Sequence, residues 1–118
     1  MNSFTAFRLS AGLGFLAVAL GAFGAHNFQA VLLQNNALEI WKTAALYHLV
    51  HAAVLLFIAS REPLQIWAWR LMFGGVLIFS GSLYILALSN VRWLGAITPL
   101  GGLGLLAGWL LLAIKTRP

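Results

Sequence analysis

The sequence predicts an all-α fold, a four-transmembrane-helix bundle with both termini on the cytoplasmic side. Hydrophobic residues make up 62% of the 118 residues and charged residues only 8%, whereas a soluble domain carries about 25% charged residues. Four continuous apolar runs approach the length of about 20 residues that spans a bilayer as a helix: 4–25, 41–60, 66–88 and 93–114. Apolar and polar residues do not alternate along these runs, as they would in the strands of a membrane barrel. We therefore expect a single integral membrane domain over 1–118.

The first run, 4–25, shares features with a secretory signal peptide, because it is N-terminal, has one basic residue and ends in small residues. We interpret it as the first span. The polar segment 26–40 follows. Some of its apolar residues could form one face of a short amphipathic helix on the far membrane surface, and an irregular loop is the alternative; they are Phe28, Val31, Leu32 and Leu38.

The later spans, 41–60, 66–88 and 93–114, are separated by short polar segments at 61–63 and 89–92. Tryptophans stand where these spans begin, and such rings prefer the headgroup region; they are Trp41, Trp67, Trp69 and Trp93. In the last span, Pro99 either kinks a continuous helix or lies in the first turn of a helix that Thr98 caps.

Basic residues are distributed unequally between the two ends of the predicted bundle. With four spans, both termini and the segment 61–66 share one side with five basic residues: Arg8, Arg61, Arg70, Lys115 and Arg117. Lys42 and Arg92 belong to the other side. The positive-inside rule therefore predicts cytoplasmic termini.

Small residues recur at helical spacing in three spans, where they allow close backbone approach in lipid. We expect them to pack the helices of one chain together, with a homo-oligomer interface as the alternative. The positions are Gly14, Ala17, Gly21, Ala25, Gly74, Gly81, Gly101, Gly104 and Gly108.

Polar side chains inside the predicted spans gather in the half of the bilayer away from the termini. A rise of 1.5 Å per residue places His48 roughly 10 Å and His51 roughly 15 Å in from Trp41. Two interpretations remain open: a pocket for a ligand or proton, and a hydrogen-bonded network that fixes helix packing. The candidate ligand-binding residues are His26, His48, His51, Ser80, Ser82, Tyr84 and Thr98.

The composition argues against several kinds of chemistry. The chain has no cysteine and only two acidic residues, Glu39 and Glu62, which lie in predicted loops. His48 and His51 alone make an incomplete metal site, so we predict no metal or cofactor. Without a carboxylate to orient either histidine, we expect no catalytic residues and no enzyme. The basic residues form no continuous stripe, so we expect contacts with membrane lipids and none with nucleic acid.

Four motifs occur in the order of a known family: Gly21-Ala22-Phe23-Gly24-Ala25-His26, Tyr47-His48-Leu49-Val50-His51, Phe79-Ser80-Gly81-Ser82-Leu83-Tyr84, and Ile97-Thr98-Pro99-Leu100-Gly101-Gly102 with Gly108-Trp109. Together they resemble the small multi-pass membrane proteins of domain of unknown function 423, to which eukaryotic transmembrane protein 256 is similar. The resemblance implies a four-helix protein of a bacterial inner membrane, without an established activity. It also implies motif positions at most of the polar candidates, whereas His48 stands where such proteins can carry another polar residue.

We expect a nonenzymatic accessory or interaction subunit, with a membrane-protein partner or a homo-oligomer. The alternative is a lipid-, small-solute- or proton-binding or transport protein that uses the polar cluster. The smooth glycine faces and short loops favour the first hypothesis.

Overall fold

The structure, a computed structural model, describes residues 1–115 and is helical throughout its regular elements. Arg117, counted above in the charge distribution, lies outside the described residues. The elements are α1 (Ser3–Ala25), α2 (Gln29–Gln34), α3 (Leu38–Ser60), α4 (Ile66–Ser89), the 3₁₀-helix η1 (Arg92–Ala96) and α5 (Thr98–Lys115).

Four segments are long and apolar enough to cross a membrane, namely α1, α3, α4 and the continuous stretch 92–115. A helix of 23 residues, such as α1 or α3, is roughly 35 Å long. That length exceeds the bilayer core of about 30 Å. The all-α prediction with four spans is confirmed.

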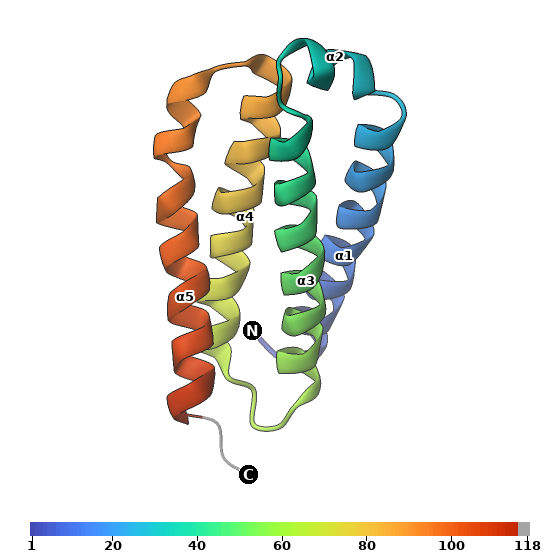
Figure 1. Cartoon of the computed structure of the whole chain (residues 1–118). Coiled ribbons are helices and arrows are strands. Elements are labelled where there is room, and N and C mark those ends of the chain that lie inside the picture. Colours follow the sequence, from blue (N-terminus) through green and yellow to red (C-terminus); the bar gives the residue numbers. More distant parts are fainter. Residues whose placement is uncertain (116–118) are drawn as a thin grey trace.

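The long helices pack mainly as successive neighbours (Figure 1). Helix α1 lies against α3, α3 against α4, and α4 against α5. The blue α1 and the red α5 therefore stand at opposite ends of the arrangement (Figure 1). Side chains from all four helices still share one core cluster, which includes Leu13, Leu55, Trp69, Met72 and Leu105.

Helix ends follow from local sequence. Asn2 caps α1, its side chain accepting a hydrogen bond from the Thr5 amide at 2.8 Å. Helix α4 ends at Ser89 and is capped by Asn90, whose left-handed backbone (φ 59°) suits a helix C-terminus. Pro99 lies in the first turn of α5, so the alternative of a helix beginning there fits better than a kinked span. Thr98 was the predicted cap of this helix, but its hydroxyl hydrogen-bonds to the Ser82 hydroxyl and to the Leu94 carbonyl.

The segment after α1 forms the short helix α2, one of the two alternatives predicted. Leu32 is fully buried, and Phe28 and Leu38 pack against the same cluster. Val31 differs from the predicted face, because it is 40% exposed. The Asn35 amide donates to the Ala87 carbonyl at 2.9 Å, which fastens this segment to the end of α4.

The glycines of α5 let it approach α4 closely. A Cβ on Gly101 would collide with the Phe79 backbone nitrogen, and one on Gly104 would lie 3.0 Å from the Leu71 carbonyl oxygen. A Cβ on Gly108 would lie 3.1 Å from Met72. These positions form the close α4–α5 contact that small residues permit in membranes.

On α4 the structure differs from the predicted face. A Cβ on Gly74 or Gly81 would meet no described atom within 4 Å, whereas one on Gly75 would lie 2.8 Å from the Leu105 nitrogen. One residue turns a helix by about 100°, so Gly75 faces α5 while Gly74 and Gly81 face outward.

On α1 the buried face is also rotated from the predicted stripe. Ala17 is buried and Gly14 lies near Ala52 of α3, but Ala25 is exposed and Gly21 has no neighbour within 4 Å for an added Cβ. The closest approach belongs to Gly24, where the Trp41 indole occupies the space of a side chain. The bulky indole explains why glycine stands there.

Candidate functional site

His48 and Tyr84 form a buried polar pair between α3 and α4. His48 Nδ1 lies 2.9 Å from the Tyr84 hydroxyl, and the two residues are 4% and 9% exposed. The Tyr84 ring packs on Trp41, with centroids 4.6 Å apart. His48 Nε2 is buried without a hydrogen-bond partner among the described residues. Tyr84 therefore supplies the one hydrogen bond that the imidazole makes there.

His51, one turn further along α3, is directed to a different helix. Its Nε2 accepts a hydrogen bond from the Trp109 indole of α5 at 3.1 Å, and its Nδ1 lies 2.8 Å from the Tyr47 carbonyl oxygen. An indole N–H only donates and a carbonyl only accepts. These two partners fix the imidazole as the neutral tautomer with its hydrogen on Nδ1. The hydrogen bond from Trp109 links α5 to α3.

The remaining polar candidates also have protein partners. Ser80 donates to the Ala44 carbonyl of α3 at 2.8 Å, and the Ser82 and Thr98 hydroxyls lie 2.7 Å apart between α4 and α5. All three are less than a tenth exposed. His26 does not join them, because it is exposed at the C-terminus of α1. The predicted cluster is thus divided into separate links between pairs of helices.

Sequence reasoning missed three indoles that make such links. Trp41 donates to the Leu20 carbonyl of α1 at 2.9 Å and Trp69 to the Ser10 hydroxyl at 2.9 Å. Both are about 2% exposed or less, unlike Trp67 and Trp93, so this buried pair packs inside the bundle and contacts other helices. A deep indole N–H needs an acceptor, and this requirement could have identified Trp109 as the partner of His51.

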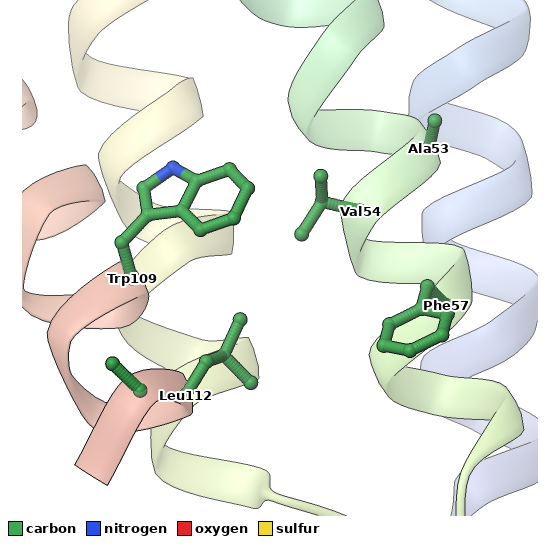
Figure 2. Close-up of a pocket in the computed structure, with 6 residues that line it drawn as sticks. Ala53, Val54, Phe57, Trp109 and Leu112 are labelled. Carbon is green, nitrogen blue, oxygen red and sulfur yellow. The ribbon is translucent and has the colours of Figure 1, made fainter. Parts of the chain in front are cut away.

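Below the His51–Trp109 link, an apolar groove separates α3 from α5. Figure 2 shows Val54 and Phe57 of α3 across from Trp109 and Leu112 of α5. Ala53 and Ala113 complete the lining of a space of about 510 Å³. We call this space the α3–α5 groove.

The α3–α5 groove lies in the half of the helix bundle near the α3–α4 connection. Ala53 to Phe57 precede the end of α3 by seven to three residues, or roughly 11–5 Å. Phe57 is 54% exposed and Trp109 45% exposed, so within a span the groove opens to lipid. Sequence reasoning predicted that this half is apolar but located no site there.

The groups required for metal or carboxylate chemistry do not converge at either place. Among residues 1–115 there is no cluster of three or more His, Cys, Asp or Glu side chains. Glu39 lies 3.6 Å from Lys42, and Glu62 accepts a hydrogen bond from Ser3. Ser80 and His51 use different partners and form no dyad.

Comparison with known proteins gives a family without an assigned activity. The family described as "Protein of unknown function (DUF423)" matches residues 20–102. A UPF0382 membrane protein of Staphylococcus haemolyticus is 45% identical over 105 residues, covering 86% of this chain and 85% of the relative.

The UPF0382 membrane protein YwdK of Bacillus subtilis is 41% identical over 106 residues, covering 84% of this chain and 85% of that protein. No solved structure matches the chain. The predicted resemblance is thereby confirmed, and the matched segment contains all seven polar candidates. The chain belongs to the DUF423 family of membrane proteins.

Proposed function

We propose that this protein is a nonenzymatic membrane protein that binds a lipid from the surrounding bilayer through the α3–α5 groove. The observation that carries the proposal is the groove itself, an apolar space of about 510 Å³ open to lipid inside two membrane spans. Small-molecule sites occupy about 300–1,000 Å³ and are mostly apolar. A lipid acyl chain is the molecule most abundant at that depth.

The polar residues support a structural role beside this groove. Each buried hydroxyl or imidazole of the spans already bonds a neighbouring helix or its own backbone, as His48, His51 and Ser80 illustrate. Such bonds contribute about 0.6–2 kcal/mol each in membranes. The ligand site therefore moves from the predicted polar cluster to the apolar half.

Filling the α3–α5 groove tests the proposal. Ala53→Trp adds an indole to the groove lining, and Leu103→Trp, on an exposed position of α5 outside the lining, is the matched control. The protein is reconstituted in nanodiscs of phosphatidylglycerol and phosphatidylethanolamine and released for native mass spectrometry. We expect wild type and Leu103→Trp to retain one lipid and Ala53→Trp to lose it. Equal retention by both variants, with both folded, would contradict the proposal.

The outward glycines of α4 favour a second candidate, an accessory subunit that binds a helix of another membrane protein. Gly74 and Gly81 are two turns apart and unused within the described chain, and small residues permit close helix contact in lipid. A photo-reactive residue at Ile78, between them, should crosslink to a protein of defined mass, and Gly81→Leu should abolish this product. Crosslinks to lipid alone would exclude the second candidate.

We place the protein in the bacterial inner (plasma) membrane, with both termini in the cytoplasm. The relatives named above are bacterial membrane proteins, and inner-membrane proteins span the bilayer as apolar helices. Basic residues concentrate at the end that carries the termini, which supports this orientation.

A further inference from the structure

The α3–α5 groove has a cationic end. Helix α3 ends at Ser60, and Arg61 follows as its C-terminal cap. The guanidinium of Arg61 lies 5.5 Å from the ring centroid of Phe57, and Phe57 lines the groove. A charge held over a groove residue marks the groove mouth.

A second basic residue ends the other wall. Helix α5 carries Leu112 and Ala113 in the groove lining and ends at Lys115. The ends of α3 and α5 lie at the same end of the molecule (Figure 1). Residues three apart share a helix face, so Lys115 continues the face of Leu112 toward the membrane surface.

The acidic residue beside this mouth is directed elsewhere. Glu62 follows Arg61 directly, but its carboxylate accepts a hydrogen bond from Ser3 at 3.1 Å, at the start of α1. Within residues 1–115 the one ion pair is Glu39–Lys42, which belongs to the other end of the spans. Arg61 is exposed, and its guanidinium has no ion-pair partner among residues 1–115.

We infer that the α3–α5 groove binds an anionic phospholipid, with an acyl chain against Phe57 and Trp109 and the phosphate on Arg61, assisted by Lys115. This inference rests on the proposed function and adds the headgroup charge. Arg side chains lay their aliphatic stems along apolar surfaces while the charged end reaches the interface, and guanidinium pairs well with phosphate. The apolar α3–α5 groove with basic residues at its mouth therefore complements a phospholipid that has an apolar chain and an anionic headgroup.

The experiment measures headgroup preference in nanodiscs that contain equimolar phosphatidylglycerol and phosphatidylethanolamine. Native mass spectrometry gives the ratio of the two lipids retained by wild type, Arg61→Gln, Lys115→Gln and Arg70→Gln. Arg70 is the matched control, because its guanidinium lies over Trp67, an aromatic residue of α4 outside the groove lining.

We expect wild type to retain mainly phosphatidylglycerol, and Arg61→Gln to lower its preference by about fivefold, the effect of one basic residue near an anionic surface. Lys115→Gln should lower it less and Arg70→Gln should leave it unchanged. An equal change in Arg61→Gln and Arg70→Gln, or none in Arg61→Gln, would overturn the inference. If Ala53→Trp still abolished lipid retention, the proposed lipid binding would stand without the headgroup preference. If Ala53→Trp left lipid retention unchanged, both the proposed function and this inference would be wrong.

Discussion

Buried polar side chains in this protein are held by specific, directed hydrogen bonds. His51 illustrates the principle, because an indole donor on one nitrogen and a carbonyl acceptor on the other leave one tautomer possible. Among the described residues, the Tyr84 hydroxyl is the one hydrogen-bond partner of the His48 imidazole. In hydrocarbon, unpaired polar groups are costly, so these partners stabilise a defined helix arrangement.

Removal of the Tyr84 hydroxyl should therefore destabilise the fold. Tyr84→Phe keeps the ring that packs on Trp41 but leaves both nitrogens of His48 without a partner. We expect the free energy of unfolding to fall by about 0.6–2 kcal/mol, measured by unfolding in mixed detergent micelles.

The matched control for this measurement is Tyr47→Phe. Tyr47 lies on the same helix as His48 but is 41% exposed, and its backbone carbonyl, which serves His51, survives the substitution. The control should leave stability nearly unchanged. Equal stability of Tyr84→Phe and wild type would mean that the His48–Tyr84 bond adds nothing to packing.

Between elements, glycines decide where two backbones meet. Gly101→Ala would place a methyl group against the Phe79 backbone of α4, whereas Gly74→Ala would add the same methyl group where no described atom lies within 4 Å. Overpacking costs about 1–3 kcal/mol. We therefore expect Gly101→Ala to lower the melting temperature in detergent and Gly74→Ala to leave it unchanged or raised. A lower melting temperature for Gly74→Ala than for Gly101→Ala would mean that α4 and α5 do not meet at Gly101.

Much of this helix level could be predicted from the sequence. Apolar run length gave the spans because a bilayer requires about 20 residues, and the α5 stripe was recognised from its Gly101, Gly104 and Gly108 spacing. Adjacent alternatives were harder. Gly74 and Gly75 are equally small, and Trp67 and Trp69 are equally amphipathic, so only the tertiary contacts show which one faces inward.

The site itself was less predictable than the helices. Polar residues at similar depth suggested one cluster, but they lie on different helix faces and bond different neighbours. The α3–α5 groove depends on how far apart two helices stand, and this separation is fixed by α4 lying between them. The sequence pattern along a single helix does not reveal the distance between α3 and α5.

At the scale of the whole molecule, helices packed as successive neighbours leave a lateral opening that a symmetric bundle would close. Helix α5 is held mainly by its glycine face on α4 and by the Trp109–His51 bond to α3. The opening lies in the half of the protein where α3 and α5 end (Figure 1). The lipid available to the proposed site therefore depends on which leaflet that half occupies.

Orientation can be tested with reporters at three positions. Four basic residues of the described chain lie at the terminal end, Arg8, Arg61, Arg70 and Lys115, while at the other end Lys42 faces Glu39 and Arg92 donates to the Asn35 carbonyl. The positive-inside rule then predicts that a green fluorescent protein fused to either terminus is fluorescent in a bacterial host. Alkaline phosphatase inserted after Asn90 should be active, because that turn would face the periplasm.

Non-fluorescent fusions at both termini, together with an inactive phosphatase after Asn90, would reverse the orientation. This outcome would also bear on the lipid inference. The cytoplasmic leaflet carries anionic lipids that attract basic juxtamembrane segments, and cytoplasmic termini would put Arg61 and Lys115 at that surface. Reversed termini would direct the groove mouth to the opposite leaflet, where the headgroup preference of Arg61 would have to be measured against the lipids found there.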